Sequence, residues 1–374
     1  MSNCRVDGNL PEELIEFGAK DAGICMNCGQ CTVVCPMPEG KHLFPRKMML
    51  YMQMGLREKL LKSPEPWLCY YCGDCSKQCP RGANPGEAMM AARRSLTSQY
   101  DWTGLSRLLY ISTAAEVVAV LAVASFVVLL FVLNLTVFGG EIVTTEMSVN
   151  KFADVHLVEF ADLAMASILT FFLLTNTWRM KNFIMSGEPD LKIPFSLYIT
   201  TAGTYLWNFA TQPRWQQCSD NPVRWRKHLV LMSGYITMLT LIVVFLRWFQ
   251  VDDNSWHFSA LFGYYATATL MYITADMMIS RLRKKEEMHK HSHPSDWMFL
   301  ILLFMTTFTG ILLHGLRLAN LPMATYIIYV IHLAIAVPML VIEVPFGKWA
   351  HLMYRPMAAF LVRVQERARE LQSA

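Results

Sequence analysis

The feature that most constrains this chain is a pair of cysteine runs between residues 25 and 79. The runs have the same internal spacing, and each ends in Cys-Pro. Three thiolates at this spacing can hold three irons of one cubane, while the fourth points towards the other cluster. The spacing therefore predicts two [4Fe–4S] clusters with exchanged fourth ligands: Cys25, Cys28, Cys31 and Cys79 for one, and Cys69, Cys72, Cys75 and Cys35 for the other.

Zinc sites and disulfides explain the runs less well. A zinc pair needs four ligands per site, typically with a long gap between two CxxC halves. Residues Met1–Leu10 contain no apolar stretch, so we expect no secretory signal and no oxidising compartment. Cys4 and Cys218 fall outside the pattern, and we expect them to be plain thiols.

Residues 1–104 are expected to form a helical domain around the clusters. Pro11 and the acidic residues after it are typical of a helix start. The segments 45–62 and 86–98 are rich in helix-forming residues. Two bound clusters would supply folding energy that so small a core lacks. We therefore predict a helical ferredoxin domain.

The rest of the chain is too apolar for a water-soluble protein of this size. The sequence is 54% hydrophobic with a mean hydropathy of +0.29, which indicates several membrane spans. It contains no phosphate-binding glycine loop and no basic nucleic-acid face. We predict an all-α, six-helix transmembrane domain over residues 105–350, with spans at 108–138, 155–178, 228–249, 258–280, 297–316 and 325–349.

Charge asymmetry orients these spans. The segments 179–227, 281–293 and 348–374 carry at least five Lys/Arg each, whereas the loops on the other side carry at most one each. The positive-inside rule then places both termini in the cytoplasm and the protein in the inner membrane. The segment 193–210 is apolar but contains Pro194 and is flanked by basic residues, so we expect an interfacial helix. The tail 351–374 has the same amphipathic character.

Histidines near the ends of the spans are candidate haem ligands, because a polar group in lipid is costly unless it has a function. His228 and His351 both lie at the inner boundary and can bind one haem b between them. If the sixth span continues to His351, His332 lies about 28 Å away near the outer side, at about 1.5 Å per residue. Its first-choice partner in an outer haem is His156, with His314 as the alternative.

Two charged residues suggest a quinone or proton site. Glu343 lies within the sixth span, where an acid costs roughly 2.5–3.5 kcal/mol on insertion scales; pairing with Lys348 is the alternative explanation. Arg317, with His314 beside it, could bind a quinone head group or anchor the helix at the interface. The quinone-site candidates are therefore His314, Arg317 and Glu343.

The residues resemble two known families. The cysteine half, with Pro45-Arg46 and the Pro-Arg-Gly-Ala-Asn run at 80–84, resembles the C subunit of heterodisulfide reductase. The membrane half resembles the E subunit of that enzyme and the γ subunit of respiratory nitrate reductase, where His228, His332 and His351 match haem-ligand positions. This chain departs from the γ subunit at Met238, because the γ subunit has a second histidine at that position.

The fusion of these halves is similar to the C subunit of quinone-interacting membrane-bound oxidoreductases. That resemblance implies a menaquinone pool, two haems b, flavin and iron–sulfur partner subunits, and adenylylsulfate reductase as the final acceptor in sulfate respiration. The leading hypothesis is therefore an electron conduit. A heterodisulfide reductase-like enzyme, which would need an adjacent cysteine pair, and a membrane anchor with structural haems are the alternatives.

Overall fold

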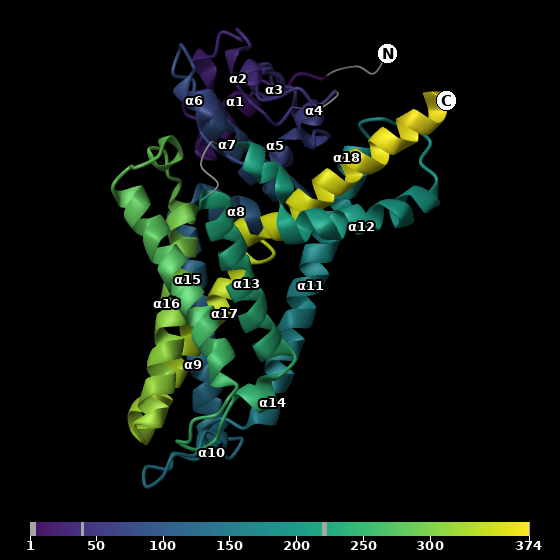
Figure 1. The fold of residues 1–374 in the computed structure, drawn as a ribbon. Helices are drawn as coiled ribbons and strands as arrows, with labels where there is room; N and C mark the ends of the chain where they lie inside the picture. Colours follow the sequence, from purple (N-terminus) through teal and green to yellow (C-terminus); the bar gives the residue numbers. More distant parts are fainter. Residues whose placement is uncertain (1–4, 39–40, 219–222, 374) are drawn as a thin grey trace.

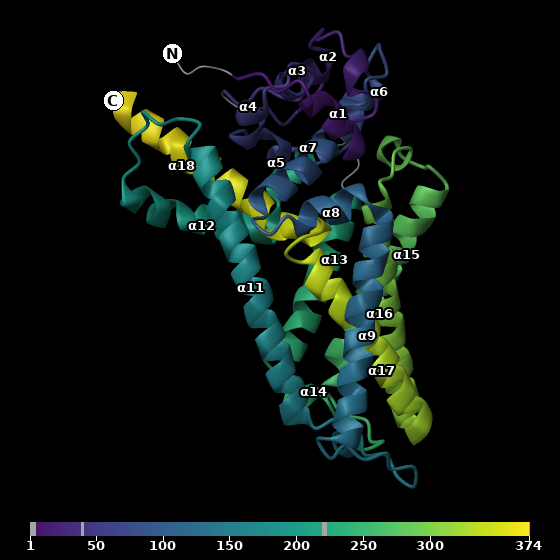
Figure 2. The ribbon, with the colours of Figure 1, turned by 180° about the vertical axis from the view of Figure 1, so that it is seen from behind.

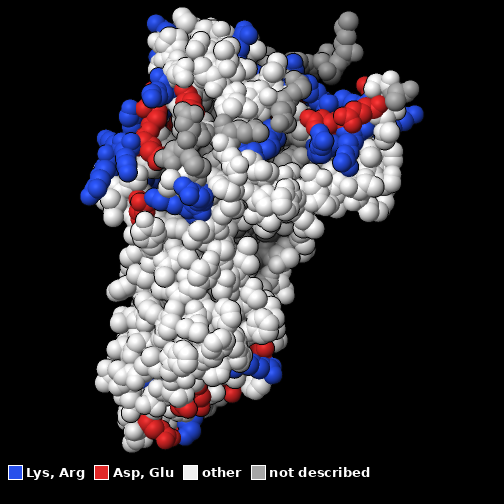
Figure 3. Space-filling model, viewed as in Figure 1, with Lys and Arg blue, Asp and Glu red and all other residues white. Residues whose placement is uncertain are grey.

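The chain is helical throughout the part that the structure describes. A computed structural model describes residues 5–38, 41–218 and 223–373, and these contain helices and no β-strand. A compact N-terminal unit caps one end of a long helical bundle (Figure 1). Charged side chains gather at the two ends of the molecule, and the flank between them is apolar (Figure 3). The predicted all-α class is confirmed.

The N-terminal unit consists of short helices wrapped around one longer helix. Their bounds are α1 (Leu10–Glu16), η1 (Ala22–Ile24), α2 (Gln30–Val33), α3 (Arg46–Gln53), α4 (Arg57–Leu61), α5 (Glu65–Leu68), α6 (Asp74–Lys77), α7 (Pro85–Tyr100) and α8 (Leu105–Ile111). The prediction of one helix over 45–62 is wrong. The chain turns at Gly55, which has a φ of +66° and separates α3 from α4.

The hydrophobic core of this unit continues into the bundle. Leu14 of α1, Met48 of α3 and Met89 of α7 are fully or almost fully buried together. Tyr354 and Leu361, from the last helix α18 (His351–Ser373), belong to the same core. Burying such side chains stabilises the fold by about 1.5–3 kcal/mol each, so the N-terminal unit is fixed to the bundle by apolar packing.

Among the described residues, the bundle contains four helices that are long and apolar enough to cross a membrane. They are α9 (Thr113–Thr136), α11 (Val155–Met185), α16 (Pro294–Leu318) and α17 (Pro322–Glu343). Two more helices, α13 (Val223–Val243) and α15 (Ala260–Leu282), lie alongside them (Figure 2). At the end far from the N-terminal unit are the short helices α10 (Val149–Phe152) and α14 (Leu246–Phe249). Length and composition thus support four of the six predicted spans.

Several span boundaries differ from the predictions: the predicted span 228–249 is broken between Val243 of α13 and Leu246 of α14, and the predicted span 155–178 extends to Met185. The predicted span 108–138 is interrupted at Ser112, whose extended backbone ends α8 and whose side chain accepts a hydrogen bond from the amide of Ala115 at the start of α9. The predicted span 325–349 ends at Glu343, where α17 stops and a turn begins. Only the 3-10 turn η4 (Lys348–Ala350) separates this turn from α18.

The idea that His332 and His351 share one straight helix is therefore wrong. The Glu343 carboxylate accepts a hydrogen bond from the Lys348 amide at 2.8 Å, which closes the turn. A Cβ on Gly347 would lie 2.3 Å from that carboxylate and 2.8 Å from the Glu343 Cα, so the turn requires glycine there. Beyond it α18 leaves the direction of the bundle (Figure 1).

Helix α18 and helix α12 (Phe195–Thr211) form an arm that projects sideways beside the N-terminal unit (Figures 1 and 2). Thr201 on α12 is fully buried and contacts Arg367 of α18. The other face of α12 exposes large apolar side chains, namely Phe195, Ile199, Leu206 and Trp207. The segment η2 (Pro213–Cys218) follows, and η3 (Glu287–His289) lies in the loop after α15.

Candidate functional site

The two cysteine runs fold into loops with the same backbone. Asn27 and Gly29 have φ values of 54° and 92°, and Tyr71 and Gly73, at the equivalent positions, have 55° and 93°. In both loops the first thiol accepts an amide hydrogen bond, at 3.4 Å from Asn27 and 3.3 Å from Tyr71. Such N–H bonds favour the thiolate form that a cluster needs.

The distant cysteines affect one another electrostatically across the two loops. Burial raises the pKa of Cys31, and the neighbouring thiols Cys25, Cys28 and Cys79 raise it further. Burial likewise raises the pKa of Cys35 to about 12, with Cys69, Cys72 and Cys31 adding to the shift. Thiols of both runs therefore lie close enough to influence each other, as the predicted exchange of fourth ligands requires.

The eight cysteines of the two runs could supply the ligands of two cubanes. A [4Fe–4S] cluster is held by four thiolates, one for each iron, and would add one-electron redox chemistry. Across residues 5–38, 41–218 and 223–373, no group of three His, Cys, Asp or Glu side chains is arranged to hold a single metal ion.

The two loops differ in their surroundings. Cys28 of the first loop is exposed, whereas Cys69 and Cys75 of the second are buried. The thiol of Cys218, at the end of η2, forms a hydrogen bond with Cys72. Sequence reasoning gave Cys218 no role, because nothing in its local pattern indicates proximity to a cysteine so far away in the chain. The second cluster therefore faces the bundle.

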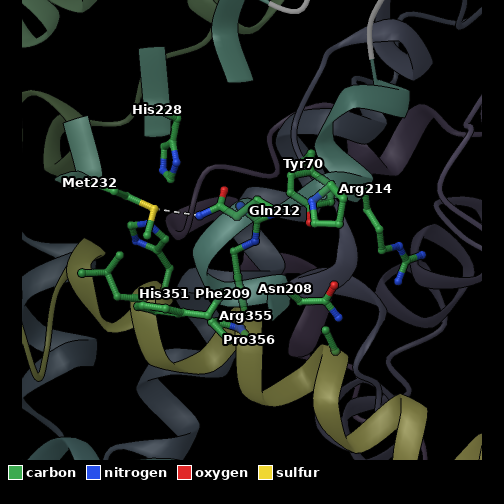
Figure 4. A pocket seen from close by; sticks show the side chains of 13 residues that line it. Tyr70, Asn208, Phe209, Gln212, Arg214, His228, Met232, His351, Arg355 and Pro356 are labelled. Carbon is green, nitrogen blue, oxygen red and sulfur yellow. Dashed lines mark hydrogen bonds between the residues drawn. The ribbon is translucent and has the colours of Figure 1, made fainter. Parts of the chain in front are cut away.

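His228 and His351 line one pocket beneath the second cysteine loop (Figure 4). His228 belongs to α13, and its buried Nδ1 atom has no hydrogen-bond partner within the described residues. The Nδ1 atom of His351 contacts the carbonyl of Lys348. If Nδ1 carries the proton, this contact orients the ring and leaves Nε2 free to bind a metal. The pair that the sequence predicted as inner-haem ligands is thus brought together.

The space between the two imidazoles is occupied by flexible side chains. Gln212 donates a hydrogen bond to the sulfur of Met232 at 2.8 Å, and Figure 4 shows this contact between the rings of His228 and His351. A porphyrin bound by both imidazoles would displace these two side chains. Arg355 also lines the pocket and supplies a positive charge suited to a propionate. The two imidazoles and the Arg355 guanidinium could therefore hold a haem only if Gln212 and Met232 left the space between the rings.

Aromatic side chains connect this pocket with the second cysteine loop. Tyr70, between Cys69 and Cys72, lines the same pocket as His228. The Trp215 ring lies 5.4 Å from the Tyr70 ring and 4.6 Å from the His228 ring, measured between centroids. The pocket and the second cluster site are therefore separated by little more than one layer of side chains.

The histidines predicted for an outer haem have separate surroundings. His332 forms a hydrogen bond through Nδ1 with Thr309 of α16 at 2.9 Å. His156 is exposed at the start of α11. His314 forms a hydrogen bond through Nε2 with Tyr264 of α15 at 2.7 Å. None of these contacts joins His332 to either proposed partner.

Arg317 and Glu343 each have defined partners. Arg317 of α16 lies 3.5 Å from His314. It also donates hydrogen bonds to the backbone carbonyls of Asp253 and Ser255 and so holds the loop between α14 and α15. Glu343 bonds the Lys348 amide, and its Oε1 atom is buried without a hydrogen-bond partner in the described residues. The suggested pairing of Glu343 with the Lys348 ammonium is not formed, because that group contacts Asp296 instead.

A buried charge cluster joins the N-terminal unit to the bundle. Asp296, in the first turn of α16, contacts Lys348 and lies 3.8 Å from Arg94 and 3.7 Å from Arg281. Arg94 also bonds Glu87 at 3.0 Å. Tyr71 of the second cysteine loop donates to the same Glu87 at 2.6 Å. The cluster loop and the helical bundle are thus linked by side chains of which the sequence analysis had considered only Lys348.

Comparison with known proteins is informative for the N-terminal part. Residues 24–84 match the family of 4Fe-4S dicluster domains. A protein of Archaeoglobus profundus that is described as similar to the C subunit of heterodisulfide reductase is 35% identical over 96 residues, covering 25% of this chain and 51% of that protein. The C subunit of the ferredoxin:CoB-CoM heterodisulfide reductase of Methanosarcina mazei is 34% identical over 89 residues. The match covers 23% of this chain and 54% of that protein.

A third relative is the iron–sulfur C subunit of the CoB–CoM heterodisulfide reductase of Methanopyrus kandleri, 39% identical over 69 residues, covering 18% of this chain and 36% of that protein. The chain spans about half or less of the length of these curated relatives. No solved structure matches the chain. Residues 24–84 are thus a 4Fe-4S dicluster domain, and the N-terminal part of the chain is homologous to the C subunit of heterodisulfide reductase.

Proposed function

We propose that this chain is a membrane electron-transfer subunit that passes electrons between the menaquinone pool and soluble flavin and iron–sulfur subunits, towards adenylylsulfate reductase. The observation that carries the proposal is that Tyr70, between two ligands of the second cluster, lines the pocket of His228 and His351. Relatives named as oxidoreductase subunits support a redox role. The chain works as one subunit of a larger enzyme.

The proposed cofactors are two [4Fe–4S] clusters and haem b. His228 and His351 bind the inner haem, and His332 binds an outer haem with His156 or His314. Menaquinone reacts near His314, Arg317 or Glu343. The unpartnered Oε1 atom of Glu343 supports a proton-accepting role there, because quinol oxidation releases protons.

The proposed topology has six spans in the cytoplasmic membrane, with both termini on the cytoplasmic side. Helices α13 and α15 complete the bundle beside the four most apolar helices. The apolar flank in Figure 3 is consistent with lipid around the bundle. The exposed apolar face of α12 supports an interfacial position for residues 193–210.

Two other functions are less well supported. A heterodisulfide reductase-like enzyme would need an adjacent cysteine pair for its special cluster, and the sequence contains no Cys-Cys. A membrane anchor with structural haems would not need Tyr70 and Trp215 packed between the haem pocket and a cluster loop.

The test is reduction of the intact complex by a menaquinol analogue without oxygen. We expect both b-type haem absorption and the electron paramagnetic resonance signals of reduced clusters to appear. His228→Ala should remove one haem and abolish cluster reduction by quinol, while dithionite still reduces the clusters. His257→Ala is the matched control, since the His257 ring bonds Ser259 and packs on the Trp248 ring, outside the pocket of His228. Cluster reduction by quinol in His228→Ala would overturn the proposed route.

A further inference from the structure

The first cysteine loop lies in an unusual patch of the surface. Cys28 is exposed, and three large apolar side chains near it are exposed as well, namely Ile24 by 49%, Met26 by 60% and Val33 by 81%. All three lie within five residues of Cys28 in the sequence, and exposed apolar patches mark interaction sites. We call these residues the apolar centre of the Cys28 patch.

Basic residues surround this centre. Arg46 packs its side chain 3.5 Å from the Cβ position of Gly29, inside the loop. Lys77 ends α6, which packs on α2, and Arg81 follows the cluster ligand Cys79 by two residues. Lys20 precedes Asp21, whose carboxylate accepts a hydrogen bond from Asn84 at 2.5 Å.

These four basic residues, Lys20, Arg46, Lys77 and Arg81, are exposed. Among the residues that the structure describes, none of the four forms an ion pair, although many other charged residues do. Carboxylates near them among the described residues include Asp21, Asp74 and Glu287, which packs against Gly73 at the start of α6 and pairs with Lys290. The Cys28 patch therefore combines an apolar centre with an excess of unpaired positive charge.

The position of the patch excludes lipid as its partner. Helices α2 and α6 lie at the end of the molecule opposite α10 and α14, beyond the level of α12 (Figure 1). Figure 3 shows this end as a mostly uncharged cap with Lys and Arg, and some Asp and Glu, at its margin. The second cysteine loop faces the bundle, so the first loop is the water-facing end of the iron–sulfur domain.

We infer that the Cys28 patch is the docking site of a soluble one-electron carrier with an acidic rim around its own exposed cofactor. Positive and negative rims steer the encounter, and the apolar centre is desolvated on contact. One electron then passes between the cluster held by Cys25, Cys28, Cys31 and Cys79 and the carrier's cofactor, with no bond made or broken. The inference rests on the proposed function, because it assumes that this domain exchanges electrons with soluble proteins.

The test uses two haem proteins of opposite charge as oxidants. The intact complex is reduced with dithionite, freed of excess reductant, and mixed without oxygen with acidic ferric cytochrome b5 or basic ferric cytochrome c. We expect cytochrome b5 to react roughly tenfold or more faster at low ionic strength. The difference should shrink as salt rises above about 0.1 M, where the Debye length is about 10 Å.

Charge reversal within the patch locates the contact. Lys77→Glu and Arg81→Glu should each slow the reaction with cytochrome b5 severalfold and accelerate that with cytochrome c. Lys59→Glu is the matched control, because Lys59 is exposed on α4, away from α2. It makes the same change in net charge and should alter neither rate. Val33→Ser should slow the reaction with cytochrome b5 even at high salt.

The inference is overturned if the three charge reversals have equal effects, or if neither patch variant changes either rate. It is also overturned if Val33→Ser and the parent protein react equally fast at high salt. Iron content confirms that each variant retains its clusters. Reduction with dithionite bypasses quinol, so failure here is distinguishable from failure of the proposed quinone reaction.

Discussion

The guanidinium of Arg355 lies over the ring of Tyr70, 4.1 Å from its centroid. Arg355 comes from α18, which packs on the bundle, while Tyr70 lies between Cys69 and Cys72 of the second cluster site. The Arg355 side chain also donates to the carbonyl of Trp67 at 3.3 Å. One cation thus belongs both to the wall of the histidine pocket and to the cluster loop.

Replacing Arg355 with Met should lower the midpoint potential of one cluster and leave the other unchanged. The positive charge stabilises the more negative reduced cluster, so its removal disfavours reduction. Redox titration followed by electron paramagnetic resonance measures the shift. Arg363→Met, an exposed residue of the same helix paired with Glu366, should leave both potentials unchanged. Equal shifts in both variants would contradict this prediction.

Cys218→Ala should also lower the potential of the second cluster, without loss of iron. The Cys218 thiol forms a hydrogen bond with Cys72, and hydrogen bonds to ligand sulfurs raise cluster potentials. Cys72→Ala, by contrast, should lose iron because it removes a ligand. Iron analysis and redox titration of the two variants distinguish these roles. Loss of iron in Cys218→Ala would show that Cys218 is a ligand.

Gly347→Ala should destabilise the turn between α17 and α18 and with it the position of His351. The added Cβ would lie 2.8 Å from the Cα of Glu343, a backbone clash that the turn cannot relieve by side-chain rotation. We expect reduced b-type absorption and a lower melting temperature. Gly315→Ala is the control, because a Cβ there has nothing within 4 Å. A Gly347→Ala protein with full haem content would contradict the expectation.

Glu65 should make the stability of the N-terminal domain depend on acid pH. Burial opposes its ionisation, but the hydrogen bond with His42 and the charge of Lys47 outweigh burial and hold the pKa of Glu65 below its usual 4.5. Because the folded-state pKa is lowered, the stabilisation is present above about pH 4.5 and is lost as pH falls through the folded-state pKa.

The rate at which cluster absorbance disappears in denaturant at several pH values measures this effect. In Glu65→Gln the acid-dependent part of the profile should flatten, and the variant should be less stable than the parent protein at neutral pH. Glu58→Gln, an exposed residue on α4, should keep the parent profile. A parent-like profile in Glu65→Gln would place the acid dependence elsewhere.

Asp296→Asn should loosen the N-terminal domain from the bundle. It leaves Arg94, Arg281 and Lys348 without their shared buried carboxylate, and breaking a buried pair costs about 3–5 kcal/mol. Limited proteolysis should cleave the chain near residues 101–104 faster than in the parent protein. Asp276→Asn removes the partly exposed partner of Lys227 and should change the cleavage rate little. Equal cleavage in both variants would argue against the junction role.

Local patterns predicted much of this protein. The cysteine spacing indicated two clusters because thiolates a few residues apart can reach one cubane, and residues 24–84 are indeed a 4Fe-4S dicluster domain. The apolar runs indicated membrane helices, and four of them are long and apolar enough. The pairing of His228 with His351 followed from their equal depth, and the two share a pocket.

What the sequence by itself determined, therefore, are features that depend on neighbours along the chain, such as cluster spacing, helix type and hydropathy. Only the tertiary structure decided that the Cys218 thiol lies within hydrogen-bonding reach of Cys72, that Tyr70 lines the pocket of His228, and that α17 ends at Glu343. Each of these depends on packing between segments far apart in sequence or on the close approach of Gly347 to Glu343. Such contacts leave no periodic signal in the residues that make them.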